Sequence, residues 1–231
     1  DVKDLLLWKR RKFRIRVQVN DTSNDQRTRD IIDAARLRWE RVITERTIED
    51  ISVNITVRDL DNPGVLAMAV VTQLQENKGK IIPLKGSITF NSMTWGIQSI
   101  LRRRTGILDG YYTMLHEMGH TLGIGPLWAI NNLVNEMGEY IGNNGLREFR
   151  TILNDQNAKY IPIEKLGGVG TSGVHLLEDT DDQNVGLDAE IMTGYKEAIT
   201  TDEPLSAISV GMLEDLGYSV DYTAADKYVI Q

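Results

Sequence analysis

A predicted helix that carries two histidines one turn apart is the feature that most constrains this chain of 231 residues. Apolar side chains recur there at helical spacing and predict an amphipathic helix over about residues 109–122: Leu108, Tyr111, Leu115, Met118 and Leu122. His116 and His120 are four residues apart, so both imidazoles project from the same face of this helix. The helix therefore presents two ring nitrogens side by side.

The two histidines flank a glutamate in the order His116-Glu117-Met118-Gly119-His120. Two neutral ring nitrogens at this separation can bind one Zn²⁺ at about 2.0–2.1 Å each. Glu117 lies beside that face, where its carboxylate can reach a water on the metal without being a ligand. Zinc lowers the pKa of such a water toward about 7, and the glutamate accepts its proton as a general base. The segment therefore predicts a zinc site with Glu117 as the catalytic base.

A catalytic zinc ion needs a third protein ligand and keeps one position open. In the compact form of this motif, a glycine ends the helix and a third histidine follows three residues later. Gly123 matches that glycine, but Pro126 stands at the ligand position. Because the chain has three histidines and no cysteine, His175 is the remaining neutral nitrogen ligand. A carboxylate as third ligand stays open as the alternative, supplied by Glu178, Asp179 or Glu190.

Other periodic patterns predict a mixture of strands and helices around this helix. Alternation and helical spacing predict, in order, a strand at 13–19, a helix at 26–43 after Ser23, Asn24 and Asp25, a strand at 51–57 and a helix at 207–216 ended by Gly217. The continuous apolar run Val65–Thr72 is typical of a strand buried on both faces. Ile81–Asn91 contains Pro83 and Gly86, which favours a strand at the edge of the sheet.

This order predicts an α+β fold over residues 1–231 as a single domain. A twisted mixed sheet and the helix with the histidines are expected in an upper lobe, about 13–124. An irregular lower lobe, about 125–231, is expected to be closed by the last helix. The longest apolar run, Val65–Val71, is too short to span a bilayer, and residues 1–8 do not have the shape of a signal peptide.

The charge balance is acidic, with 26 Lys and Arg against 33 Asp and Glu, which argues against a nucleic-acid binder. Residues 1–16 run against this balance, because they hold seven basic and two acidic residues. The alternation from residue 13 favours these basic residues as the solvent face of the first strand. A basic arm that binds an anionic partner stays open as the alternative. Arg102–Arg104 is expected to be a charged loop.

The absence of cysteine excludes disulfides, thiol catalysis and cysteine-based zinc fingers. A second metal is suggested by Asp179-Thr180-Asp181-Asp182, because Ca²⁺ prefers clustered carboxylate oxygens. These residues lack the regular spacing of a calcium loop, so a solvated acidic loop is the favoured interpretation.

Several segments together resemble the metzincin metalloproteases, and within them the leishmanolysin-like branch, in which an insertion separates the third histidine from the helix. The matching segments fall within residues 13–222: His116–Ile124, Val174-His175, Asp188–Thr193, Leu205–Ser209 and Leu213–Tyr218. Gly86–Asn91 also looks like the edge strand of that family. The resemblance implies a zinc-dependent endopeptidase in which Met192 forms the turn beneath the zinc ion.

The resemblance also implies a protein or peptide substrate that binds extended along Gly86–Asn91. Some metzincins carry a tyrosine near the metal two residues after the turn methionine. Here Tyr195 follows Met192 by three residues, which makes it a candidate transition-state donor, with a role in the cleft wall favoured.

The leishmanolysin-like proteins are rich in disulfides, so this cysteine-free chain resembles a minimal relative. The resemblance favours an extracellular location or a place in a secreted, surface or particle assembly. The alternative function is a catalytically silent, zinc-stabilised module of a surface layer or virus particle. Glu117 argues against it, because a module that only holds metal has no use for that carboxylate. The sequence gives no indication of the oligomeric state.

Overall fold

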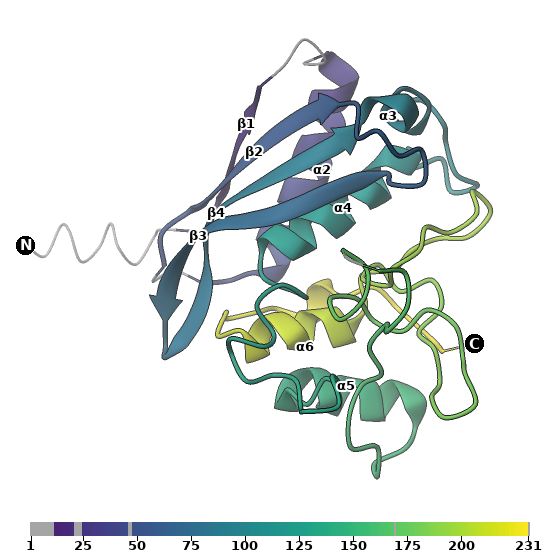
Figure 1. The fold of residues 1–231 in the computed structure, drawn as a ribbon. Coiled ribbons are helices and arrows are strands. Elements are labelled where there is room, and N and C mark those ends of the chain that lie inside the picture. The colour runs from purple at the N-terminus through teal and green to yellow at the C-terminus, as the bar shows by residue number, and fades with distance from the viewer. Residues whose placement is uncertain (1–11, 21–24, 46–47, 169, 231) are drawn as a thin grey trace, which may run out of the picture.

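The computed structural model describes residues 12–20, 25–45, 48–168 and 170–230. Within these residues the chain forms one four-stranded mixed sheet and five α-helices, which confirms the α+β class. The sheet and the first three helices form the upper part of the molecule in Figure 1, and the last two helices lie below the histidine-bearing helix. Within the described part of the chain, no helix is long and apolar enough to cross a membrane.

The sheet has the order β1-β2-β4-β3. Its strands are β1 (Ile15–Val19), β2 (Ile51–Arg58), β3 (Ala67–Asn77) and β4 (Lys80–Asn91). β1, β2 and β4 run parallel, and β3 runs antiparallel to β4. Along β2, Ile51, Val53 and Ile55 are buried while Asn54 is exposed, so one face of the sheet packs on the core and the other faces solvent.

Two long helices pack beneath this apolar face. α2 (Gln26–Val42) is capped by Asp25, whose carboxylate accepts a hydrogen bond from the amide of Thr28 at 2.8 Å. α4 (Asp109–Thr121) lies beside it, and the indole of Trp39 donates to the carbonyl of Leu115 at 2.9 Å. A short helix, α3 (Ser92–Gln98), follows β4. The predicted helices at 26–43 and 109–122 are therefore confirmed.

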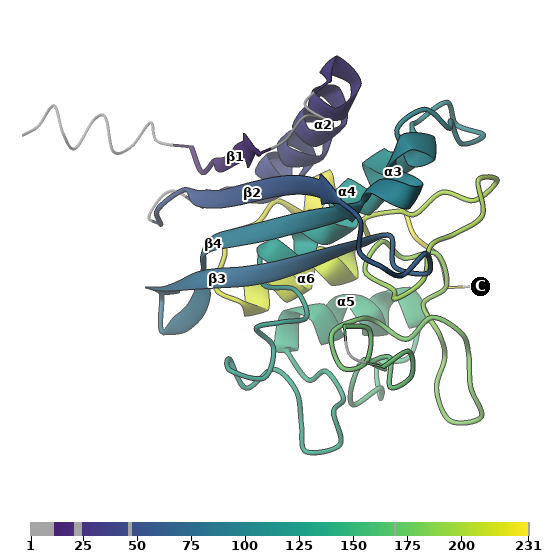
Figure 2. The same cartoon turned by 45° about the horizontal axis from the view of Figure 1, so that its top comes forward.

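The second half of the chain is loop-rich and contains α5 (Asn143–Leu153), α6 (Ala207–Asp215) and a 3₁₀ turn, η1 (Tyr222–Ala224). Asp215 joins the two helices, because its carboxylate accepts from the amides of Asn144 and Gly145 at 2.8 and 2.9 Å. It thereby caps the positive N-terminal end of α5. Both helices lie on the opposite side of α4 from the sheet (Figure 2).

The predicted order of the last two strands is wrong. The sequence favoured Val65–Thr72 as a strand buried on both faces, but β3 is the edge strand, and its exposed side chains alternate with half-buried ones over residues 67–72. Met68 and Val70 expose 45% and 53% of their surface, so the apolar run marks an open edge instead of a buried centre.

β4 was expected at the edge and lies between β2 and β3 instead. Pro83 is tolerated because the pairing with β2 begins only at Lys85, so no partner on that side requires a hydrogen bond from residue 83. At Gly86 an added Cβ would lie 3.1 Å from the side chain of Thr121. The glycine therefore allows close packing of α4 against the sheet.

The basic residues of the first strand lie on its solvent face, as predicted, for the part that the structure describes. Lys12, Arg14 and Arg16 are exposed, while Phe13 and Ile15 are buried. Residues 1–11, which hold the rest of the basic segment, and the cap candidates Ser23 and Asn24 lie outside the described residues.

Candidate metal centre

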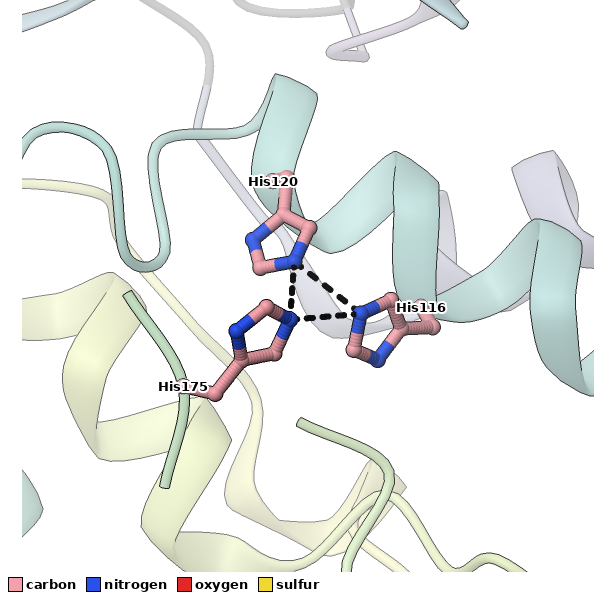
Figure 3. A group of neighbouring side chains, drawn as sticks. All are labelled: His116, His120 and His175. Atoms are coloured by element: carbon pink, nitrogen blue, oxygen red, sulfur yellow. Dashed lines mark hydrogen bonds between the residues drawn. The ribbon is translucent and has the colours of Figure 1, made fainter. Parts of the chain in front are cut away.

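The three histidines of the chain meet at one point (Figure 3). His116 and His120 project from α4, and His175 comes from a loop in the second half of the chain. The Nε2 atom of His116 lies 3.0 Å from that of His120 and 3.1 Å from that of His175. The third side of this triangle, from His120 to His175, measures 3.0 Å. The structure thus places His175 beside the pair predicted from the helix.

The other ring nitrogen of each histidine contacts a backbone carbonyl. The Nδ1 atoms of His116, His120 and His175 lie 2.7, 2.9 and 2.9 Å from the carbonyl oxygens of Ile191, Ile124 and Thr171, respectively. Because a carbonyl oxygen only accepts, each Nδ1 carries the proton and donates it. Each Nε2 is then left with a lone pair, and the three lone pairs converge.

Gly123 allows the backbone to form one of these contacts, the one between His120 and the carbonyl of Ile124. Its φ of +105° lies in the region that favours glycine, and the chain turns back there after α4 ends. The carbonyl of Ile124 consequently reaches the Nδ1 of His120, one turn earlier. The glycine singled out in the sequence therefore orients one of the histidines.

Burial keeps the three rings neutral. It lowers the pKa of His116 to about 3, with the neighbouring ring of His175 adding to the shift. It also holds the pKa of His120 well below its usual value and lowers the pKa of His175. At neutral pH the rings are therefore neutral, with a proton on Nδ1 and none on Nε2, which is the form that binds metal through Nε2.

The triad fits a divalent transition-metal ion. Tetrahedral coordination with metal–nitrogen bonds of about 2.0–2.1 Å separates neighbouring nitrogens by about 3.3 Å. The observed 3.0–3.1 Å is close to this value, and a cation is what offsets the repulsion of three converging lone pairs. Three imidazoles suit zinc, copper, iron or nickel, so the geometry is compatible with zinc without identifying it.

The carboxylates that were alternatives for the third ligand are engaged elsewhere. Asp179 is exposed, and Glu178 belongs to a separate acidic cluster. Glu190 is buried, and its carboxylate accepts from the amide of Met192 at 2.6 Å and from the hydroxyls of Ser206 and Ser209 at 2.6 and 2.8 Å. Glu190 therefore fixes the turn at Met192 to the start of α6, a role that the sequence analysis missed.

Glu117 lies in the same cleft as the three histidines but not within the nitrogen triangle. It is 6% exposed, and no described residue hydrogen-bonds to its carboxylate. Burial raises the pKa of Glu117 to about 8. A carboxyl group with a raised pKa that lines the same cleft as three converging histidines favours a chemical role.

Met192 packs beneath the histidine helix. It is fully buried, and a Cβ added to Gly119 would lie 2.6 Å from its sulfur and 3.1 Å from the ring of Trp39. The glycine between His116 and His120 therefore leaves the space that Met192 fills.

Substitution of Gly119 by alanine is expected to destabilise the protein by about 1–3 kcal/mol, because the added methyl group overpacks the contact with Met192. Gly96→Ala in α3 is the matched control, since no atom lies within 4 Å of the Cβ that it adds. Urea unfolding of both variants measures the difference. Equal stability of the two alanine variants would contradict the tight contact.

The cleft that holds the triad has a volume of about 520 Å³. Its walls come from residues 64–70, which lead into β3 and form its first residues, from α4, and from the loops at 170–175 and 193–196. Tyr195 lines it and is 52% exposed, so the wall position expected from the sequence is available to it. A second cavity of about 600 Å³, lined by Arg38, Tyr111 and Tyr228 among others, contains none of the histidines.

The sequence suggested that Arg103 belongs to a charged loop at the surface. In the structure this side chain is buried instead, with 3% of its surface exposed. Its guanidinium pairs with Asp109 at 2.9 Å and with Glu203. Lys196 reaches the other carboxylate oxygen of Asp109 at 3.3 Å. This network ties the first turn of α4 to the loop that follows Met192. The sequence carries no local signal for it, because its partners lie up to 100 residues apart.

The acidic loop Asp179–Asp182 does not gather its carboxylates around a common point. Asp179, Asp181 and Asp182 are exposed, and Asp181 accepts from the backbone amides of Gln183 and Asn184 at 2.7 and 2.6 Å. The solvated loop favoured from the sequence is the arrangement that the structure has.

Neither a known family model nor a curated protein matches this sequence.

Proposed function

We propose that this protein is a zinc-dependent endopeptidase of the metzincin type, with a leishmanolysin-like separation of its third histidine. The observation that carries the proposal is the convergence of three neutral histidine Nε2 atoms beside a buried, unpaired glutamate in one cleft. His116, His120 and His175 would hold the zinc ion. Met192 would support their helix from below.

Each group in the cleft would have a distinct task. When bound, zinc supplies Lewis-acid chemistry, which polarises a carbonyl and makes a water molecule more acidic. Glu117 would accept the proton of the attacking water and later donate it to the nitrogen of the leaving amine. A cation beside Glu117 favours the charged carboxylate and so lowers its raised pKa toward neutrality, where a general base works best.

The substrate would bind along β3 and not along Gly86–Asn91, because that segment is in the centre of the sheet. Among the described residues, β3 pairs only with β4, so its outer edge is free. The start of this strand borders the cleft of the histidines. An extended peptide can add to such an edge through backbone hydrogen bonds, with Met68 and Val70 offering apolar contacts.

A series of peptide substrates, each N-methylated at one backbone nitrogen, tests this mode of binding. Methylation at alternate positions should raise KM by about 2- to 10-fold, because each lost hydrogen bond contributes about 0.5–1.5 kcal/mol. Methylation at the intervening positions should have little effect. A KM that is insensitive at every position near the cleavage site would contradict binding along β3.

A peptide-library digest tests the proposed function directly. The zinc-loaded protein is expected to cleave internal peptide bonds, and mass spectrometry of the products identifies them. A strong chelator should abolish the cleavage. Bound zinc without any cleavage of the library would instead favour the alternative, a catalytically silent zinc-stabilised module. Full cleavage by metal-free protein would contradict both.

A further inference from the structure

A second group of ligand-type side chains lies apart from the histidines. Glu178, Asp188 and Glu197 each offer one carboxylate oxygen, and these oxygens all lie within 4.8 Å of one another. The three residues come from separate segments: Glu178 follows His175, Asp188 precedes the turn at Met192, and Glu197 follows it. Three negative groups at this distance repel one another unless something compensates their charge.

Glu178 is the buried member of this group, and Asp188 and Glu197 are half-buried. Glu178 is 7% exposed, and its Oε2 is buried and has no hydrogen-bond partner. Two basic side chains beside Glu197 are directed elsewhere. Lys196 pairs with Asp109, and Arg103 pairs with Asp109 and Glu203 and contacts only the backbone carbonyl of Glu197, not its carboxylate. A buried carboxylate oxygen without a donor costs free energy, so a partner outside the protein chain is favoured.

The protonation behaviour of the group supports this view. Burial, with additions from Glu197 and Asp188, raises the pKa of Glu178 to about 7. Burial also raises the pKa of Glu197. Glu178 and Glu197 therefore keep their protons to higher pH than isolated carboxyl groups, unless a cation compensates their charge.

We propose that Glu178, Asp188 and Glu197 form a second cation site that takes Ca²⁺. Three carboxylates supply up to six oxygen ligands, the type that hard cations prefer. Ca²⁺ accepts about 6–8 oxygens in irregular geometry, whereas Mg²⁺ requires a near-ideal octahedron at about 2.0–2.1 Å. Ligands from three loop segments suit the larger ion. This site is distinct from the acidic loop Asp179–Asp182, whose side chains are exposed.

The site stabilises the segments that carry the metal centre. The amide of Leu176 donates to the carbonyl of Met192 at 3.0 Å, and that of Leu187 donates to the carbonyl of Leu177 at 2.8 Å. The three carboxylates therefore lie on loop segments that already pack around His175 and Met192. A cation that joins them holds this loop region together and binds the folded state alone.

Thermal unfolding and calorimetric titration of the zinc-loaded full chain with CaCl₂ test the proposal. Ca²⁺ at about a hundred times its Kd is expected to raise Tm by roughly 5 °C or more. Glu178→Gln and Glu197→Gln should each weaken Ca²⁺ binding at least about tenfold and remove the rise in Tm. Asp182→Asn, which removes one charge from the adjacent exposed loop, is the matched control and should keep both. Zinc content should stay unchanged in all three variants.

Three results would overturn the proposal. The first is a wild-type protein that shows neither heat of binding nor a change in Tm with Ca²⁺. The second is an equal response to Mg²⁺, which would refute the assignment to Ca²⁺. The third is a higher Tm of Glu178→Gln without Ca²⁺, combined with no effect of Ca²⁺ on the wild type, which would show that the carboxylates share a proton. Glu197 is only partly buried, so Glu197→Gln keeps the test valid if Glu178→Gln fails to fold.

Discussion

Substitution of Glu117 by glutamine is expected to lower kcat/KM for peptide hydrolysis by about 10²–10⁴-fold, or more, while zinc stays bound. Glutamine has nearly the same shape but cannot accept the proton of the attacking water. The carboxylate of Glu117 lies outside the nitrogen triangle and has no hydrogen-bond partner among the described residues, so its loss removes no ligand and no structural contact. Kinetic assays and metal analysis of the same sample measure both parts of the prediction.

A control variant separates chemistry from general damage to the fold. Glu139→Gln removes another buried carboxylate, which pairs with Asn135 at 2.7 Å and does not line the cleft. This variant should keep the wild-type kcat/KM. Loss of zinc from Glu117→Gln would show that Glu117 is a ligand, and the general-base role would then be wrong.

Substitution of His175 by alanine is expected to weaken zinc binding at least about 100-fold. Loss of a group that merely supports a ligand already costs about 10–100-fold in metal affinity, and His175 would be a ligand itself. Hydrogen exchange should also become faster over residues 125–175, because the metal ties this region to α4 and contributes free energy of folding. A competition titration with a zinc chelator measures the affinity, and mass spectrometry measures the exchange.

Ser172→Ala is the matched control in the same loop. It removes an exposed hydroxyl that donates to the carbonyl of Lys165 at 3.0 Å and leaves all three imidazoles in place. It should keep the zinc affinity of the wild type. An unchanged affinity in His175→Ala would refute the leishmanolysin-like arrangement, because His175 would then not be a ligand.

The parts of this molecule that depend on near neighbours in the chain could be predicted from its sequence. α2 with its cap at Asp25, α4 and α6 are all found where apolar spacing placed them. The proximity of His116 and His120 could be predicted in the same way, because two residues four positions apart project from the same face of a helix. His175 was reached differently, by elimination among the side chains that bind zinc through nitrogen or sulfur.

The order of β3 and β4 could not be predicted, because an apolar run has the same pattern in a buried strand and in an edge strand that borders a cleft. Gly86 suggested a sheet edge for a related reason. A glycine that weakens a strand and a glycine that allows a helix to pack closely are identical in the sequence. Only the neighbouring Thr121 on α4 distinguishes them.

The polar networks around the site could not be predicted from the sequence either. Arg103 finds Glu203 one hundred residues away, and Glu190 finds Ser206 and Ser209 across a loop. The cluster of Glu178, Asp188 and Glu197 has no periodic spacing either. Such contacts depend on the paths of irregular loops. In the sequence, the residues that form them cannot be distinguished from ordinary charged surface residues.

The central claim is that one zinc ion, held by three histidines, makes this chain a peptidase, and a zinc titration of metal-free protein tests it most directly. Peptide cleavage is measured after each addition of zinc, and bound metal is measured in the same samples. We expect cleavage to be absent at the start, to rise in proportion to bound zinc and to reach its maximum at about one ion per chain. Cleavage before any zinc is added, or one bound ion per chain with no cleavage at all, would contradict the claim.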